Sequence, residues 1–247
     1  MCAKIVIYTA IFGNYDGLIP QPEFPNIDYL CFTDKPVNCK PWRVVEVASK
    51  FKDPILDARY HKILGHPILE EYDTSIYIDG NFLMLTNPDK LIQEKLQGDK
   101  VLAYFDHNKA DDARDCIYEE YGALLKLEEE KGYFKDDPKA MKNLIDFLRK
   151  ENYPKRNGLI SSGVLLRKHK DQELKLLMKE WWYFVKNYTK RDQLSFNYVL
   201  WKKNFDRYDL LEGDIRRGNP WFYFLGSHRK DYRIKLLKYK LKKLLRK

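Results

Sequence analysis

The chain has 247 residues, of which 44% are hydrophobic and 33% charged, which is typical of one α/β domain with its own core. No segment contains the roughly 20 consecutive apolar residues of a membrane-spanning helix, and the first residues lack the basic-then-apolar build of a secretory signal. We therefore expect a cytoplasmic protein whose four cysteines are reduced thiols.

The formal net charge of +9 is concentrated at one end of the chain. Residues 229–247 contain ten lysines and arginines and a single acid, so residues 1–228 are neutral. A nucleic-acid-binding domain would carry a basic patch on its main surface, so we expect no nucleic-acid partner. We divide the chain into a main domain, residues 1–228, and a basic tail, residues 229–247.

Apolar, β-branched runs alternate with segments of helical periodicity along the chain. In chain order, strands are expected at residues 4–9, 28–33, 42–47, 74–79, 82–85, 100–105 and 158–167, the last with a break at its Ser-Ser-Gly sequence. Helices are expected at residues 57–71, from residue 87 onward, and at 115–130, 137–150, 172–187 and 191–203. This alternation predicts an α/β fold with a mostly parallel sheet covered on both faces.

A polar triplet, Asp79-Gly80-Asn81, ends the apolar strand at 74–79. In an open α/β sheet, ligands bind outside the carboxyl ends of the strands. Asp79 and Asn81 carry oxygen ligands for one divalent cation, Mn²⁺ or Mg²⁺, and Gly80 lets a diphosphate approach the backbone closely. The alternative is a simple turn, in which Gly and Asn are common.

Six sequence blocks resemble, in order, the TOD/MUCI-like glycosyltransferase family, and the chain is more distantly similar to glycosyltransferase family 8. The blocks are residues 8–16 (YTAIFGNYD), 31–34 (CFTD), 53–62 (DPILDARYHK), 77–81 (YIDGN), 114–120 (RDCIYEE) and 191–196 (RDQLSF). The resemblance implies a GT-A (Rossmann-like) fold, a mostly parallel mixed sheet flanked by helices. It also implies a hexosyltransferase that uses a nucleotide sugar, with UDP favoured, and a glycan or lipid-linked saccharide acceptor of the bacterial surface polysaccharide type.

The same resemblance implies a donor site at the end of the first strand. The residues that it assigns to the nucleotide are Tyr8, Thr9, Ala10, Ile11 and Phe12, with the ring of Tyr8 or Phe12 stacked on the base. Arg59 and Lys62 lie three residues apart on one helical face and would reach the diphosphate or a donor-sugar hydroxyl together with Asp79 and Gly80. A solvated helix face is the alternative for Arg59 and Lys62.

The implied metal ligands are Asp79, Asn81 and His228. Asn81 stands where many GT-A enzymes have a second Asp, so the site is one charge weaker and the donor phosphates would complete the coordination shell. A metal-independent mechanism, with Arg59 and Lys62 neutralising the diphosphate, stays open. His228 is the last residue before the basic tail, and its alternative is an exposed loop histidine.

The implied acceptor pocket includes Ser161, Ser162, Gly163, Arg114 and Asp115. Asp192 and Gln193 are the candidate catalytic residues. In inverting enzymes a carboxylate at this place is the general base, whereas in retaining enzymes the pair orients the sugar or stabilises the positive charge on its ring. Asp192 is also a favourable helix N-cap, whatever its function.

The tail has the pattern of an amphipathic helix. On a helical wheel one narrow arc holds Ile234, Leu237, Leu241, Leu244 and Leu245, and most of the basic residues lie outside it. This pattern is typical of a helix lying in the plane of an anionic membrane surface, so we expect peripheral attachment to the inner face of the membrane through residues 229–247. A nucleic-acid-binding tail and a solvated helix are the alternatives.

Two other functions compete with sugar transfer. A nucleotidyltransferase also uses acidic strand ends on a parallel sheet, but residues 12–15 are a poor version of its Gly-rich phosphate loop. A GT-A protein that has lost catalysis and serves as a membrane-attached binding protein is the other alternative.

Overall fold

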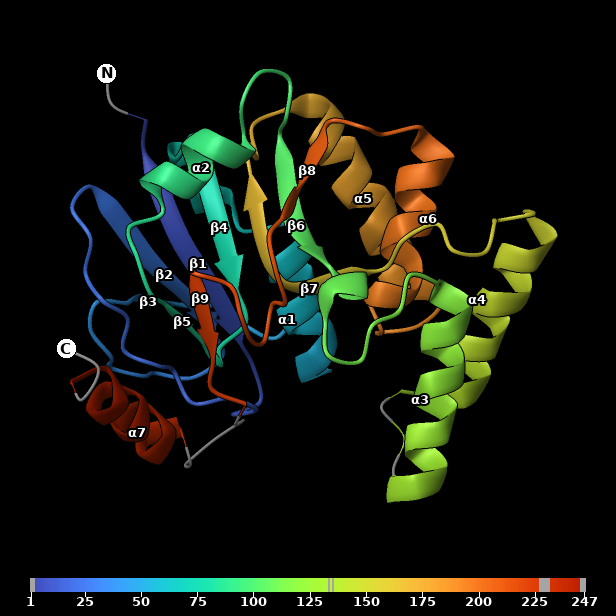
Figure 1. The fold of residues 1–247 in the computed structure, drawn as a ribbon, viewed down its shortest axis with the longest axis horizontal. Helices are drawn as coiled ribbons and strands as arrows, with labels where there is room; N and C mark the ends of the chain where they lie inside the picture. The colour runs from blue at the N-terminus through green and yellow to red at the C-terminus, as the bar shows by residue number, and fades with distance from the viewer. Residues whose placement is uncertain (1–2, 133, 135, 227–231, 245–247) are drawn as a thin grey trace.

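The computed structural model describes residues 3–132, 134, 136–226 and 232–244. Its main sheet has seven strands in the order β3-β2-β1-β4-β7-β6-β8 (Figure 1). Strand β7 is antiparallel to both neighbours, and the other neighbouring pairs are parallel. The strands are β1 (Ile5–Ile11), β2 (Ile27–Thr33), β3 (Arg43–Glu46), β4 (Thr74–Ile78), β6 (Leu102–Asp106), β7 (Ile160–Arg167) and β8 (Tyr208–Leu211). The predicted α/β fold with a mostly parallel mixed sheet is therefore confirmed.

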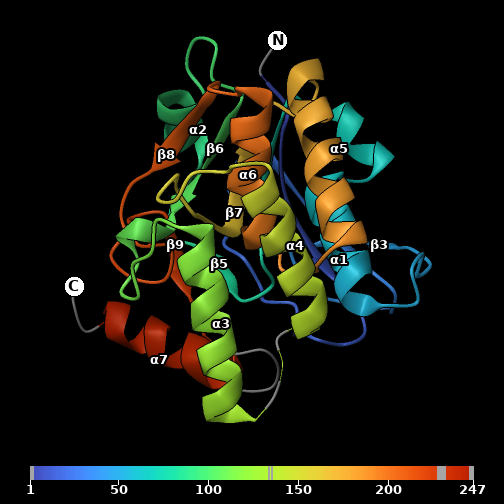
Figure 2. The same ribbon diagram turned by 90° about the vertical axis from the view of Figure 1, so that its right-hand side faces the viewer.

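A small antiparallel sheet and the helices cover the two faces of the main sheet. The small sheet pairs β5 (Phe82–Met84) with β9 (Phe222–Phe224). The helices are α1 (Pro54–Ile63), α2 (Asp89–Lys95), α3 (Ile117–Lys131), α4 (Pro138–Lys150), α5 (Gln172–Asn187), α6 (Gln193–Lys203) and α7 (Tyr232–Leu244), with 3₁₀ turns η1 (Pro67–Glu71) and η2 (His107–Lys109). Helices α1, α5 and α6 lie on one face, and α2 and the small sheet on the other (Figures 1 and 2).

The helix expected at residues 57–71 is divided in two. Asp53 caps α1 by accepting hydrogen bonds from the backbone N–H groups of Ile55 and Leu56, so the helix begins earlier than expected. Gly65 then has φ +77°, which ends the helical path, and Pro67 opens η1 instead. Local capping and glycine geometry therefore decide the bounds of this segment.

The break expected at the Ser-Ser-Gly sequence of β7 is a shift in its pairing with β6 and does not interrupt the strand. The strand is continuous and buried, but its register with β6 shifts, so that Tyr104 pairs with Leu165 while Phe105 pairs with Ser161. The residues between are thus released from β6 at the edge where β4 ends. Strands β8 and β9 have no counterpart in the sequence prediction, because they are short and partly exposed.

Alternate side chains of β1 pack into two separate hydrophobic cores, one on each face of the sheet. Val6 and Tyr8 pack with the helices α1, α5 and α6, whereas Ile7 and Ile11 pack with α2 and the small sheet. Because β1 is buried on both faces and is flanked by parallel strands, its carboxyl end is held in a fixed position.

Helix α7 packs against the small sheet through one face only. Leu236 joins a cluster with Leu83 and Leu225, and the Tyr239 ring lies 4.5 Å from that of Tyr223. The opposite face is apolar and exposed, with exposed fractions of 57% for Ile234, 59% for Leu237 and 50% for Leu241. Within the described residues, no helix is long and apolar enough to cross a membrane.

Arg167 of β7 fixes α1 to the sheet. Its guanidinium is buried and donates hydrogen bonds to the carbonyl oxygens of Ile63 at 2.8 Å and Lys62 at 2.9 Å, and to the hydroxyl of Tyr8. Burial lowers the pKa of Arg167 to about 10, so the side chain stays cationic at neutral pH.

Replacing this arginine should destabilise the fold. We expect Arg167→Met to lower the free energy of unfolding by about 3 kcal/mol, because the buried carbonyls lose a charged donor. Chemical denaturation measures the change, and the exposed Lys90→Met is the control, expected within about 0.5 kcal/mol of wild type. An Arg167→Met loss no larger than that of the control would contradict this anchoring role.

Candidate active site

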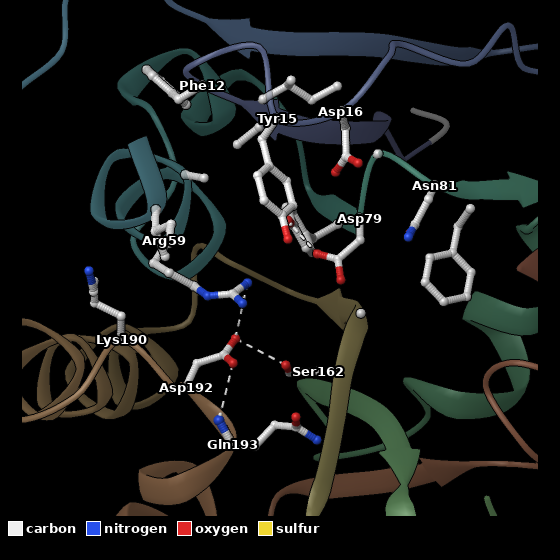
Figure 3. Close-up of a pocket in the computed structure, with 18 of the residues that line it drawn as sticks. Phe12, Tyr15, Asp16, Arg59, Asp79, Asn81, Ser162, Lys190, Asp192 and Gln193 are labelled. Carbon is white, nitrogen blue, oxygen red and sulfur yellow. Dashed lines mark hydrogen bonds and ion pairs between the residues drawn. The ribbon is translucent and has the colours of Figure 1, made fainter. Parts of the chain in front are cut away.

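A cavity of about 360 Å³ opens where strands β1 and β4 end. Strand β7 runs antiparallel to β4, so its first residues lie at the same edge. The loop after β1, helix α1 and the start of α6 form the other walls (Figure 3). The lining includes Ala10, Ile11, Phe12, Tyr15, Asp16, Arg59, Asp79, Gly80, Asn81, Ser161, Ser162, Gly163, Lys190, Arg191, Asp192, Gln193 and Arg216. The fold thus brings together most of the residues that the sequence singled out.

A buried ion pair lies beneath this cavity. The Nζ of Lys62 is 2.7 Å from Asp192 Oδ2, donates to Ser162 Oγ at 3.0 Å, and lies 3.9 Å from Asp79 Oδ1. The Lys62 side chain is 0% exposed and that of Asp192 is 2% exposed. An ammonium group in such a place must be paired, so Lys62 and Asp192 depend on each other. Lys62 itself is absent from the cavity lining.

Asp192 also contacts Arg59 and Ser162. Its Oδ2 lies 3.4 Å from Arg59 Nη1 and accepts a hydrogen bond from Ser162 Oγ at 3.0 Å (Figure 3). Burial alone raises the pKa of Asp192, but the positive charges of Arg59 and Lys62 outweigh it and hold that pKa well below its usual range. Asp192 is therefore a fixed anion. Burial lowers the pKa of Lys62, and this effect is opposed by Asp192 and Asp79.

Local structure holds Asp192 and Gln193 in place. Asp192 caps α6 by accepting from the Gln193 N–H at 3.1 Å, and the Asp192 carbonyl accepts from the Trp181 indole at 3.0 Å. The Gln193 amide donates to the Ile160 carbonyl at 2.7 Å and accepts from Arg191. The capping role and a place in the cavity thus coexist at Asp192.

The Asp79-Gly80-Asn81 triplet sits tightly against the end of β7. The Tyr77 hydroxyl donates to Asp79 Oδ1 at 2.7 Å, and the Asp79 N–H donates to the Gly163 carbonyl at 2.8 Å. A Cβ at Gly163 would stand 2.9 Å from the Phe82 ring and 3.2 Å from Asp79 Oδ2. Only glycine allows this close approach without displacing the ring of Phe82.

The Asn81 side chain is buried and has an oxygen that is unpaired within the described part of the chain. The residue is 4% exposed, and its Oδ1 accepts no hydrogen bond from the described residues. A buried orphan oxygen two residues from a carboxylate that is 34% exposed fits a hard cation. His228, the third expected ligand, lies outside the described residues. Within them, no three His, Cys, Asp or Glu side chains form a metal-ligand group.

Only part of the segment 8–12, which was expected to bind the nucleotide, lines the cavity. Tyr8 is 0% exposed, donates its hydroxyl to the Lys62 carbonyl, and does not line the cavity, so stacking of Tyr8 on a base is wrong for this structure. Thr9 is likewise buried behind the cavity. Phe12 lines it, but its ring is 1% exposed and stacked on His61. The reason is packing: Tyr8 of β1 and Phe12, which directly follows β1, both belong to the core that β1 shares with α1.

Arg114 and Asp115 do not line the cavity. Arg114 donates to Glu120 at 2.8 Å and contacts His107 at 2.8 Å. His107 in turn contacts Ser161 Oγ at 3.2 Å, which does line the cavity. Arg114 therefore supports a wall of the cavity from behind rather than facing a bound sugar.

Several polar residues that the sequence did not single out as site residues also line the cavity, among them Tyr15, Asp16, Lys190, Arg191 and Arg216. Tyr15 is 50% exposed, and Figure 3 shows its ring above Asp79. Tyr15 and Asp16 belong to a quoted sequence block and directly follow the Gly-Asn turn, so a polar loop after the first strand was an available signal. Arg216 lies in the loop between β8 and β9, where no local pattern points to it.

The Lys62–Asp192 pair yields a stability prediction. Asp192→Asn keeps the helix cap but leaves Lys62 buried without its anion, so we expect the free energy of unfolding to fall by about 3–5 kcal/mol. The double variant with Lys62→Met should lose less than the sum of the two single losses. Additive losses in denaturant titrations would contradict a coupled pair.

The Lys62–Asp192 pair also makes the stability of the fold depend on pH. The pKa of Asp192 is lower in the folded than in the unfolded protein. The contribution of its charge to the free energy of unfolding is therefore complete above the unfolded-state pKa of about 3.9, and it disappears as the pH falls towards the folded-state pKa. The stability difference between wild type and Asp192→Asn should therefore shrink below about pH 4. A difference that stays constant down to strongly acidic pH would contradict a depressed pKa.

Comparison with solved structures returns glycosyltransferases. WbbM, a bifunctional glycosyltransferase, is 14% identical with a TM-score of 0.46 and is matched over 96% of this chain and 44% of its own. GlyE from Streptococcus pneumoniae TIGR4 is 12% identical with a TM-score of 0.44, over 86% of this chain and 46% of its own. Mouse xyloside xylosyltransferase 1 is 10% identical with a TM-score of 0.47, over 90% of this chain and 97% of its own. This chain thus spans less than half the length of the first two.

Comparison of sequences gives the family. No curated protein matches the chain. A family model, described as TOD1/MUCI70, glycosyltransferase-like domain, matches residues 31–211, which include α1, the Asp79-Gly80-Asn81 triplet, β7 and the start of α6. This agrees with the resemblance in the six sequence blocks. The chain belongs to the TOD1/MUCI70 glycosyltransferase-like domain family.

Proposed function

We propose that the protein transfers a sugar from a nucleoside-diphosphate sugar, UDP-linked, to a hydroxyl of a glycan or lipid-linked saccharide, as in bacterial surface polysaccharide synthesis. The observation that carries this proposal is the arrangement of charges in the cavity. The two carboxylates of Asp192 and the partly exposed Asp79 lie beside the cations Lys62 and Arg59, with Lys62 Nζ 2.7 Å from Asp192 and 3.9 Å from Asp79. A sugar with a positively charged ring and a departing diphosphate requires both signs of charge within one site.

The nucleotide would enter from the loop after β1. The half-exposed ring of Tyr15 offers an aromatic surface on which a base would stack. The guanidinium groups of Arg59, Arg191 and Arg216 have side-chain exposures of 21%, 22% and 40% and contribute positive charge around the diphosphate. Arginine is suited to this because its planar fork matches phosphate oxygens.

Asp79 and Asn81 would hold the divalent cation, Mn²⁺ or Mg²⁺. When bound there, the cation supplies positive charge that stabilises the leaving diphosphate. The neutral Asn81 carbonyl and the Tyr77 hydrogen bond to Asp79 both weaken the field of the site. Donor phosphate oxygens are therefore part of the proposed coordination shell.

In the transfer step, the acceptor oxygen bonds to the anomeric carbon, the bond from that carbon to the diphosphate breaks, and the hydroxyl proton passes to an oxygen of the departing nucleoside diphosphate. Asp192 is a weak base, because Arg59 and Lys62 stabilise its charged form. We therefore assign Asp192 to stabilising the positive charge on the sugar ring, with Gln193 orienting the sugar. This is the role that the residue pair has in retaining enzymes. Ser161 and Gly163 would border the acceptor.

Donor binding and hydrolysis test this function. In a thermal-shift screen of UDP-, GDP- and CMP-sugars with Mn²⁺, we expect a UDP-sugar to raise the melting temperature. The enzyme should then release UDP slowly in the absence of an acceptor, and Asp79→Ala should slow release about 100-fold or more. The matched control is Asp111→Ala, at an exposed carboxylate (62%) outside the cavity.

Two outcomes would refute the proposal. One is the absence of binding by any nucleotide sugar, with or without Mn²⁺, which would favour a binding protein that has lost catalysis. The other is release of a nucleoside monophosphate or pyrophosphate, which would identify a nucleotidyltransferase.

We further propose that α7 attaches the protein peripherally to the inner, anionic face of a membrane. Its exposed apolar face (Ile234, Leu237 and Leu241) points away from the face that packs on the small sheet. The exposed Arg233 and Lys238 flank this face, so charge and apolar surface together match an anionic lipid surface. Through β9, α7 adjoins Phe224 in the cavity lining, which suits a lipid-linked acceptor.

Vesicle sedimentation tests the attachment. We expect binding to vesicles that contain phosphatidylglycerol, weaker binding to pure phosphatidylcholine, and a loss of about tenfold or more in Leu237→Gln/Leu241→Gln, because apolar burial is removed. The control is Leu176→Gln, since Leu176 is equally exposed (62%) but lies on α5. Wild-type binding by the double variant, or binding to RNA in place of vesicles, would overturn the proposal.

A further inference from the structure

We propose that Asp16 supplies a second carboxylate to the cation site and so replaces the negative charge that Asn81 lacks. The inference rests on the proposed use of a divalent cation with the donor diphosphate. It concerns a residue from the loop after β1, distant in sequence from the Asp79-Gly80-Asn81 triplet. The site would then be assembled from two segments of the chain that only the fold brings together.

The first observation is the position of Asp16 next to the triplet. A Cβ built on Gly80 would stand 3.2 Å from Asp16 Cβ, so the Asp16 side chain begins directly against the middle of the triplet. Both residues line the cavity. Figure 3 shows the Asp16 carboxylate directed toward the Asp79 carboxylate, and the Asn81 side chain beside them with its amide nitrogen at the visible end. Glycine at position 80 is what allows Asp16 to come this close.

The second, independent observation is the orphan oxygen of Asn81. Asn81 is only 4% exposed, and its Oδ1 has no hydrogen-bond partner among the described residues. A buried amide oxygen without a donor is costly unless a ligand satisfies it. A cation held between Asp16 and Asp79 would satisfy this oxygen when the amide turns it toward the two carboxylates. Because one of the three proposed ligands is an amide, the site is compatible with the absence of any group of three His, Cys, Asp or Glu side chains among the described residues.

The chemistry of the three ligands is consistent. Two carboxylate oxygens and one amide oxygen are hard donors of the kind that Mg²⁺ and Mn²⁺ take, and remaining positions would go to donor phosphates. The total charge of the set equals that of an Asp-x-Asp pair. The loop of Asp16 also carries Tyr15, so a cation bound at Asp16 would order the aromatic ring that we assign to the base.

Direct Mn²⁺ binding tests the proposal without any activity measurement. In electron paramagnetic resonance titrations of the full chain with Mn²⁺, with and without UDP, we expect Asp16→Asn to weaken Mn²⁺ binding about tenfold or more. Asn81→Asp in the wild-type background should tighten it. The decisive variant is Asp16→Asn/Asn81→Asp, which moves the carboxylate to the other position and should restore binding towards the wild-type value.

Controls separate the charge effect from unfolding. Asp111→Asn, at an exposed carboxylate outside the cavity, should bind Mn²⁺ as wild type does. Melting temperatures are recorded for each variant, and rescue by the double variant excludes a folding defect caused by Asp16→Asn alone. Unchanged Mn²⁺ binding in Asp16→Asn, or no rescue in the double variant, overturns the proposal.

A nucleotide-only role for Asp16 gives a different pattern. In that case Asp16→Asn weakens UDP binding equally with EDTA and with Mn²⁺, and leaves binding of Mn²⁺ alone unchanged, which also overturns the proposal. Failure of the proposed function is distinct, because it appears as an absence of nucleotide-sugar binding in the wild type. Mn²⁺ binding without nucleotide still reports on Asp16 in that event.

Discussion

The buried contact between Lys62 and Asp192 is the interaction on which the rest of the site depends. It joins α1 to the start of α6 across Ser162 of β7, with a 2.7 Å separation and almost no exposure of either side chain. Neither charge is tolerated in such a place alone, so the pair fixes the relative position of three elements. The pair also places a permanent anion, the Asp192 carboxylate shared with Arg59, beneath the cavity.

Close backbone approach is the second constraint. Gly80 and Gly163 let the end of β4, the loop after β1 and the start of β7 meet at distances that a side chain would prevent. The antiparallel direction of β7 brings its serines to the same edge as the ends of the parallel strands. The acidic, basic and hydroxyl groups of the site therefore converge because of strand direction and glycine placement.

The small sheet links the site to α7. Strand β5 directly follows Asn81, β9 pairs with it, and Tyr239 of α7 packs on Tyr223 of β9. The exposed apolar face of α7 is thus held at a fixed position relative to the cavity. For an enzyme of this family, this arrangement relates the orientation of the proposed membrane-bound helix to the place where an acceptor would enter.

The sequence by itself determined the alternation of strands and helices, the family, and the local candidates Asp79, Asn81, Arg59 and Asp192. Each of these depends on short-range pattern: periodicity, a polar triplet after an apolar strand, and ordered sequence blocks. Only the tertiary structure decided which face of β1 each strand residue takes, which buries Tyr8 in the core. It placed Tyr15 and Asp16, from the loop after β1, in the cavity lining. It also decided the burial of Lys62 and the antiparallel direction of β7. These features depend on packing between segments distant in sequence, and no local pattern encodes such packing.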